Sequence, residues 1–307
     1  MTSAPKAPRS INRRLLVLGL AAVLLGGCSQ GSDPPAPARD AVQSPTPAAT
    51  ATPVPQATST PEPAPWETPP VAAADPAALA EQLVTAERAI RSPAVEGPEL
   101  AWMGHLQQIV YRTLVERPEW HDEFLAALPE DVRPLAAANL NAGSSLRAMV
   151  SPGEGLPPWR IVEPAPLEEL LSHYRAAEEE FGVPWSYLAA IHLVETFSGR
   201  IRGTSVAGAQ GPMQFIPATW AAFGEGDVND DRDAIMAAAR YLVASGAPGD
   251  MAAALYSYNP SELYVRAVTG YAELMEADPD AYRGYYHWQA YFLTVDGDTH
   301  LPIGFTN

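Results

Sequence analysis

The composition of the chain changes abruptly near residue 75, and this boundary limits where a folded core can form. The segment 28–74 is dominated by Pro, Ala, Thr and Ser and contains almost no large apolar side chains. Such a segment buries too little apolar surface to offset the chain entropy lost on folding, and its prolines favour extended backbone. We therefore expect residues 28–74 to form a disordered linker.

Beyond this boundary, apolar side chains recur at the spacing of amphipathic helices. Leu79, Leu83 and Ile90 begin this pattern, which continues along the chain with prolines and glycines between the helical segments. No run of residues alternates convincingly as a strand would. The pattern predicts an all-α fold with an N-terminal helical region at 75–165 and a further domain at 166–307, whose aromatic tail packs back on the domain.

The first residues of the chain have the pattern of an export signal. A positively charged stretch precedes the apolar run 15–25, which is too short to be a comfortable membrane span, and Leu25-Gly-Gly-Cys28 follows. This pattern predicts a lipoprotein signal peptide at 1–27, with Cys28 as the lipidated first residue of an exported protein. The alternatives are an uncleaved anchor and an ordinary signal peptide that is cut elsewhere.

The charge and the polar clusters exclude several classes of function. The formal net charge is −17, so the chain is not expected to bind nucleic acid, whose phosphates an acidic surface repels. Acidic residues alternate from Asp227 as in a calcium loop, but Arg232 replaces the expected glycine and Ala238 replaces the closing glutamate. The six histidines have no zinc spacing. We expect neither a metal nor a cofactor.

One carboxylate, Glu195, ends a mostly apolar helix predicted from residue 185. It continues the stripe of Leu188, Ile191 and His192. Burial and the negative end of the helix dipole both disfavour an ionised carboxylate, so both raise its pKa, as a general acid requires. The alternative is a glutamate at the edge of the apolar face that points into water.

The loop after this helix is rich in small and amide side chains. Gly208 and Gly211 allow the backbone to approach a ligand closely, while Gln210, Met213 and Gln214 offer hydrogen bonds and an apolar contact to a sugar. No Gly-Lys-Ser/Thr sequence closes the loop, which argues against phosphate binding. The alternative interpretation is that this loop is a plain tight turn.

These motifs together resemble those of lytic transglycosylases of the lysozyme-like superfamily. The resemblance covers roughly 166–275 and rests on Glu195, Ser205 ten residues later, the sequence Gly-Ala-Gln-Gly-Pro-Met-Gln at 208–214, and Tyr258-Asn259. Two departures are Pro260 after the Tyr-Asn pair, and Ser198-Gly199 where related sequences often place other small residues. Neither departure removes a catalytic group.

The resemblance implies a lysozyme-like catalytic domain that acts on peptidoglycan glycan strands. Glu195 would protonate the β-1,4 bond between N-acetylmuramic acid and N-acetylglucosamine. It would then act as a base, and the muramoyl C6 hydroxyl would close a 1,6-anhydro ring. The substrate-binding residues would be Ser205 at the acetamido group, Tyr258 beside Glu195, and Gln210, Met213, Gln214 and Asn259 along the cleft.

Two other functions stay open at this stage. One is a muramidase that adds water, although no Asp or Glu lies between Thr196 and Trp220 to act as a nearby partner of Glu195. The other is a peptidoglycan-binding scaffold with little activity. The expected partners are glycan strands and, through the lipid on Cys28, the outer face of an envelope membrane. The helices at 75–165 would pack on the catalytic core, bind the wall separately, or recruit a partner.

Overall fold

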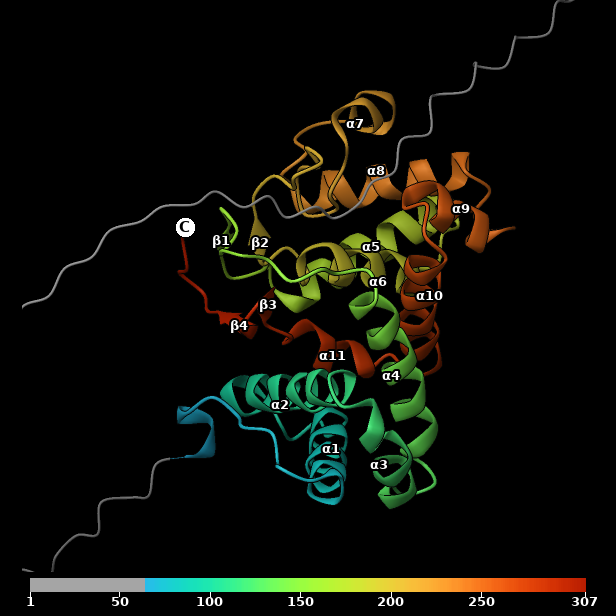
Figure 1. Cartoon of the computed structure of the whole chain (residues 1–307). Coiled ribbons are helices and arrows are strands. Elements are labelled where there is room, and N and C mark those ends of the chain that lie inside the picture. The colour runs from blue at the N-terminus through green and yellow to red at the C-terminus, as the bar shows by residue number, and fades with distance from the viewer. Residues whose placement is uncertain (1–63) are drawn as a thin grey trace, which may run out of the picture.

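The computed structural model describes residues 64–307 and is mostly helical, as predicted (Figure 1). The signal sequence, Cys28 and most of the predicted linker lie outside these residues. The end of the predicted linker, 64–74, lies against the first two helices. The Trp102 indole N–H donates to the carbonyl of Thr68 over 2.7 Å, and the Gln82 side-chain amide donates to the carbonyl of Val71 over 2.9 Å. Ordered structure therefore begins before the predicted start at residue 75.

Helix α1 begins with a capped first turn. The Asp75 carboxylate accepts a hydrogen bond from the Ala78 N–H, and Pro76 occupies the first turn. Leu79, Leu83 and Ile90 on this helix are fully buried. The elements of the region are η1 (Pro65–Glu67), α1 (Pro76–Ile90), α2 (Gly97–Val115), η2 (Pro118–Trp120), α3 (His121–Ala127) and α4 (Arg133–Arg147).

The second half of the chain forms helices that end or begin at recognisable residues. Gly182 ends α5 in a left-handed conformation, while the side chains of Asp250 and Ser261 cap α9 and α10. None of the described helices is long and apolar enough to span a bilayer. The helices are α5 (Leu167–Phe181), α6 (Trp185–Thr196), α7 (Pro217–Phe223), α8 (Asp231–Ala244), α9 (Met251–Tyr258), α10 (Glu262–Ala277) and α11 (Ala281–Tyr286).

Four short strands add to the expected helices. Strands β1 (Arg160–Ile161) and β2 (Ile201–Arg202) pair antiparallel, as do β3 (Ala290–Thr294) and β4 (Gly297–Leu301). The second pair is a hairpin within the aromatic tail, and Gly297 adopts a φ of 113° in its turn. The Asp296-Gly297 dipeptide is a hairpin signal that the sequence analysis did not use.

The two halves of the chain share one apolar core. Helix α4 packs along α10, and α2 packs against α11. Two buried hydrogen bonds cross between the halves, from the Tyr285 hydroxyl to the Asn139 side chain over 2.8 Å and from the Trp288 indole to Gln107 over 3.0 Å. Figure 1 shows α11 and the β3–β4 hairpin (red) between α2 and the helices α5 and α6. The helices at 75–165 therefore pack directly on the rest of the protein, and the aromatic tail packs back as predicted.

A buried carboxylate, Glu87, fixes this arrangement. It forms an ion pair with Arg91 and accepts hydrogen bonds from Gln107 over 3.0 Å and from the Tyr111 hydroxyl over 3.2 Å. Arg91 also pairs with Asp278, just before α11, at 2.6 Å. A buried charge is tolerated when it is paired and hydrogen-bonded in this way. The network therefore holds α1 and α2 to the chain that follows α10.

Candidate active site

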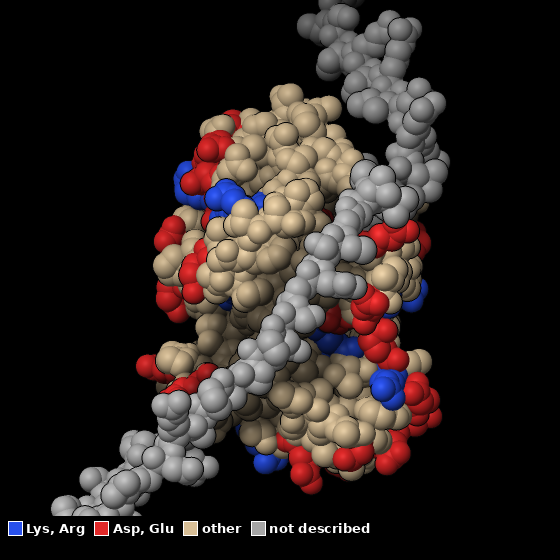
Figure 2. Space-filling view, turned by 60° about the vertical axis from the view of Figure 1, so that its left-hand side comes forward, with Lys and Arg blue, Asp and Glu red and all other residues tan. Residues whose placement is uncertain are grey.

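A cavity of about 790 Å³ lies between the two halves of the chain. Figure 2 shows acidic side chains spread over the outer surface and a hollow between the upper and lower parts of the molecule. One wall comes from α6, α10 and the loop after β2, and we call it the acid wall. The other comes from α2, α4, the segment 149–159 and the β3–β4 hairpin, and we call it the opposite wall.

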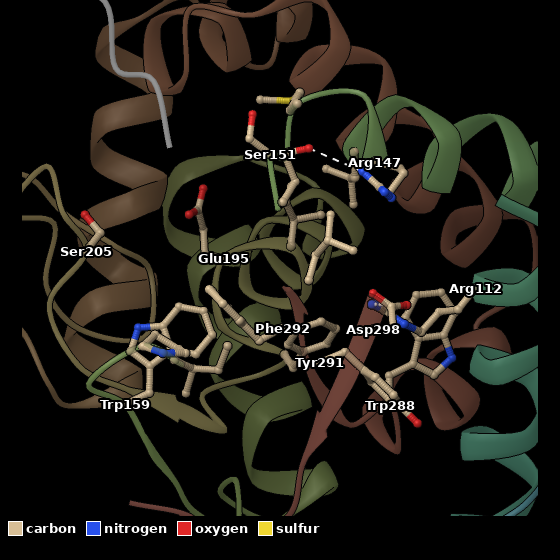
Figure 3. A pocket seen from close by; sticks show the side chains of 18 of the residues that line it. Arg112, Arg147, Ser151, Trp159, Glu195, Ser205, Trp288, Tyr291, Phe292 and Asp298 are labelled. Carbon is tan, nitrogen blue, oxygen red and sulfur yellow. Dashed lines mark hydrogen bonds and ion pairs between the residues drawn. The ribbon is translucent and has the colours of Figure 1, made fainter. Parts of the chain in front are cut away.

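Glu195 lies in the acid wall, in the last turn of α6 (Figure 3). The chain turns sharply after this helix because Phe197, Ser198 and Gly199 have left-handed φ values of 51°, 58° and 83°. Such a conformation is uncommon for residues other than glycine. The Tyr264 hydroxyl donates a hydrogen bond to Glu195 Oε1 over 2.8 Å. The carboxylate is thus held by one neighbour and directed at the cavity.

Burial dominates the electrostatics of Glu195. The residue keeps some exposed surface toward the cavity, but protein atoms surround its carboxylate closely. Desolvation of the charged form raises its pKa to about 7, against a smaller lowering by the hydrogen bond from Tyr264. About half of such a group is protonated at neutral pH, so it can donate a proton and later accept one.

Tyr258 lies near Glu195, whose charge, after burial, contributes to raising the pKa of the tyrosine, but the tyrosine hydroxyl is bonded elsewhere. Its hydroxyl donates to the backbone carbonyl of Met213 over 2.6 Å. Its ring lies parallel to that of Tyr264, with the centroids 6.5 Å apart. Tyr264, which the sequence analysis missed, is the residue that orients the acid. Nothing in the sequence distinguished it from the other buried residues on the apolar face of α10.

Three of the predicted substrate-binding residues line the cavity beside Glu195. They are Ser205, Gln214 and Asn259. The Ser205 hydroxyl accepts a hydrogen bond from the Ala209 N–H over 3.0 Å, and the Gln214 amide donates to the Gly211 carbonyl over 2.9 Å. These bonds hold the two side chains in place along the loop.

The other two predicted loop residues are placed differently. Met213 is fully buried in the core, because an apolar side chain gains most by leaving water, so it does not line the cavity. Gln210 is half-buried outside the cavity lining, and its backbone exchanges two hydrogen bonds with Phe215. Gly211 serves packing, since a Cβ there would lie 1.9 Å from the Val228 carbonyl oxygen.

The other polar clusters have structural roles. His192 is fully buried, its Nδ1 lies 2.8 Å from the Tyr174 hydroxyl, and desolvation lowers its pKa to about 3. In the acidic turn, Asp230 caps α8 and Asp231 pairs with Arg202 at 3.2 Å. Residues 64–307 contain no group of side chains arranged to hold a metal ion.

The opposite wall brings residues to the cavity that the sequence analysis did not select. They lie outside the resemblance at 166–275, so its motifs gave no reason to choose them. Local periodicity does not predict which distant segments meet at the cavity. The cluster of aromatic residues in the tail was a partial signal that the tail packs against the rest of the protein. Figure 3 labels the following residues of the opposite wall: Arg112, Arg147, Ser151, Trp159, Trp288, Tyr291, Phe292 and Asp298.

The two walls differ in whether they belong to a known protein family. Residues 172–278 match the family model described as "Transglycosylase SLT domain". The chain carries an SLT transglycosylase domain. The match includes Glu195, the loop at 205–215 and Tyr264, whereas α1–α4 and the tail from residue 281 lie outside it. No curated protein and no solved structure matches the chain. The SLT domain therefore supplies the acid wall, and flanking segments complete the cavity.

Proposed function

We propose that the protein is a lytic transglycosylase that cleaves the β-1,4 bond between N-acetylmuramic acid and N-acetylglucosamine in peptidoglycan and leaves 1,6-anhydro-muramoyl ends. The observation that carries this proposal is Glu195, a carboxylic acid with a pKa raised to about 7 in the cavity wall of an SLT domain. A group with this pKa can serve as acid and base in turn at neutral pH.

In the first step, protonated Glu195 gives its proton to the glycosidic oxygen as the bond to the muramoyl C1 breaks. The acetamido group of the muramoyl sugar assists by sharing the positive charge that develops at C1, and N-acetylglucosamine leaves with the proton. In the second step, the Glu195 carboxylate takes the proton of the C6 hydroxyl, whose oxygen bonds to C1. Glu195 is protonated again, and no water is consumed. Tyr264 holds Oε1 throughout.

A hydrolytic muramidase is the alternative function that can be judged from the carboxylates lining the cavity. An inverting hydrolase needs a second carboxylate to activate water. Three more carboxylates line the cavity, but Glu116 and Asp298 are paired with Arg147 and Arg112. Glu154 has no ion pair within the described residues, so it is the best candidate for a second carboxylate.

The location that suits this function is outside the cytoplasm. We propose that lipid on Cys28 holds the protein at the outer face of an envelope membrane, with the proline-rich segment as a tether. Cys28→Ala should abolish incorporation of a labelled fatty acid and release the protein from membranes. Unchanged labelling would show that Cys28 is not the lipidated residue.

The proposed function is tested by identifying the chemical ends of the glycan fragments that the protein releases. Purified protein is incubated with isolated peptidoglycan, and the released fragments are identified by mass spectrometry, with Glu195→Gln and Glu154→Gln beside the wild type. We expect anhydro-muramoyl ends from the wild type and from Glu154→Gln, and none from Glu195→Gln. Reducing ends that disappear in Glu154→Gln would mean hydrolysis. Binding of glycan without any release by the wild type would mean a scaffold.

A further inference from the structure

The described chain begins with a proline-rich segment that is held on the surface of α1 and α2. Figure 1 shows this segment (blue) running from η1 past α2 to the start of α1. Trp102 of α2 donates its indole N–H to the carbonyl of Thr68 over 2.7 Å. Gln82 of α1 donates to the carbonyl of Val71 and accepts from the N–H of Ala73, both over 2.9 Å. We call the surface around Trp102 and Gln82 the α1–α2 groove. It belongs neither to the lining of the active-site cavity nor to the segment that matches the SLT family.

These three hydrogen bonds bind the backbone of the segment and not its side chains. They use two carbonyls and one N–H, at the first, fourth and sixth residues of Thr-Pro-Pro-Val-Ala-Ala at 68–73. At the third position Pro70 is buried, whereas at the fourth position Val71 is 79% exposed. The Val71 N–H has no hydrogen-bond partner within 64–307, so a proline fits there equally well. A tryptophan N–H that binds a carbonyl of an extended, proline-rich backbone is typical of peptide recognition.

The sequence before residue 64 contains further copies of this six-residue pattern. Four copies, each beginning with Ser-Pro or Thr-Pro, start eight residues apart, at Ser44, Thr52, Thr60 and Thr68. The copies at 44–49 and 52–57 read Ser-Pro-Thr-Pro-Ala-Ala and Thr-Pro-Val-Pro-Gln-Ala, with proline at the exposed fourth position and an alanine N–H at the sixth. The copy at 60–65 ends in Pro65 and lacks the N–H that Gln82 requires. Two of the three upstream copies therefore offer every backbone group that the groove uses.

The segment at 68–73 does not fill the groove. A second cavity, of about 400 Å³, lies beside Ala73 and is also lined by Gln82 and Trp102. The hydrogen bonds from Trp102 and Gln82 to the segment carbonyls lie at the protein surface. A segment held by a few surface hydrogen bonds can leave while the core stays folded, so another copy can enter.

We infer that the α1–α2 groove is a binding site for the Ser/Thr-Pro copies of the chain's own N-terminal segment, and that the copy at 52–57 replaces the copy at 68–73. The copy at 52–57 places the apolar Val54 at the buried third position, where 44–49 places the more polar Thr46. Attachment to the same chain keeps the copy at a high effective concentration near the groove. The exchange removes sixteen residues from the tether proposed above and shortens its reach by about 50 Å. The groove is thus a clamp that sets the length of the tether.

The inference is tested first by binding of a peptide. A fluorescent peptide with the sequence of residues 50–59 is titrated into the full-length protein in detergent, and binding is followed by anisotropy. Ala73→Pro removes the N–H with which the resident segment binds Gln82, so the peptide should bind this variant about fivefold more tightly than the wild type. The matched control is the same peptide with Ala57→Pro, which lacks the N–H at the sixth position and should bind about fivefold more weakly. Equal binding of the two peptides, or no binding to Ala73→Pro, would overturn the inference.

Replacement within one chain is measured by hydrogen exchange and mass spectrometry on the full-length protein, after circular dichroism has shown that each variant is folded. In Ala73→Pro, exchange at Ala57 should slow by about fivefold relative to the wild type, because the copy at 52–57 occupies the groove more often. Adding Trp102→Phe, which removes the indole donor, should restore fast exchange. Fast exchange at Ala57 in every variant would contradict the replacement. Protection that grows with protein concentration would mean that the copy binds the groove of a second molecule, and would overturn its assignment to the same chain. Neither measurement depends on glycan cleavage.

Discussion

The two walls of the cavity treat charge in opposite ways. On the acid wall, Glu195 has one hydrogen-bonding neighbour among residues 64–307, Tyr264, and no paired cation there, so burial raises its pKa. On the opposite wall, each cavity arginine has a carboxylate partner, and both members of each pair reach solvent. A lone buried carboxylate is suited to moving a proton, whereas exposed charges in pairs stay hydrated and neutralise each other. The two walls therefore hold different kinds of charge, and the acid wall holds the carboxylate suited to proton transfer.

A second comparison, within α6, shows that burial alone does not make a catalytic residue. His192 and Glu195 lie one turn apart, and desolvation shifts the pKa of each toward its neutral form. His192 is fully enclosed, whereas Glu195 reaches the cavity. Access to a ligand therefore distinguishes the acid from the core histidine.

The largest expected effect comes from removing the acid. Glu195→Gln should lower the rate of glycan cleavage by about a thousandfold, the loss typical of a missing general acid. The amide still accepts the hydrogen bond from Tyr264, so the fold and glycan binding should persist. The rate is measured by the release of soluble fragments, with Glu154→Gln as the control that keeps its activity. A variant with more than about a tenth of the wild-type rate would remove Glu195 from the mechanism.

The next effect concerns how the opposite wall is attached. A Cβ on Gly104 of α2 would lie 2.7 Å from both the Gly284 carbonyl oxygen and the His287 Cβ. Gly104→Ala should therefore push α2 away from α11 and destabilise the protein by about 2 kcal/mol, measured by urea unfolding. Gly249→Ala is the matched control, since the nearest atom to its Cβ would be 3.6 Å away. Equal stability of the two variants would contradict the close packing of α2 on α11.

A comparable effect should appear in the pH dependence of stability. The pKa of Glu195 is raised from 4.5 to about 7 in the folded protein, so the folded state binds more protons than the unfolded state between these values. Stability should thus fall as pH rises through this window, by about 1–3 kcal/mol after allowance for the partial exposure of Glu195. Glu195→Gln should remove this component and be more stable than the wild type at pH 7. If the unfolding free energies of the wild type and of Glu195→Gln differ by the same amount at every pH between 4.5 and about 7, the pKa of Glu195 is not raised.

A smaller effect distinguishes the two stacked tyrosines. Tyr264→Phe removes the hydrogen bond that lowers the pKa of Glu195, so that pKa should rise. The decline of kcat/KM above neutral pH should then move to higher pH, with a rate loss of about tenfold or less. Tyr258→Phe should leave the decline of kcat/KM at the same pH as in the wild type, because the Tyr258 hydroxyl bonds to the Met213 carbonyl. A shift in the Tyr258 variant alone would restore the arrangement predicted from the sequence.

What the sequence could predict was local. Helical spacing, interrupted by prolines and glycines, predicted a mostly helical fold, and the end of an apolar helix located Glu195. Met213 was misplaced because a local pattern does not show whether a loop methionine faces the cavity or the core. The partners across the cavity were out of reach: Arg112 meets Asp298, and His105 lies 2.8 Å from the Tyr291 hydroxyl, through contacts between distant segments. Such pairings depend on tertiary packing, which leaves no periodic signal in one chain.

The origin of the oxygen at the new muramoyl end tests the account most directly. Peptidoglycan is digested in water labelled with a heavy oxygen isotope, and the fragments are weighed by mass spectrometry. If Glu195 passes the C6 hydroxyl proton and the ring closes, the muramoyl ends are anhydro and contain no label. Ends that gain a labelled oxygen during cleavage would show that water attacks C1, and would contradict the assignment of Glu195 as acid and base in a transglycosylase.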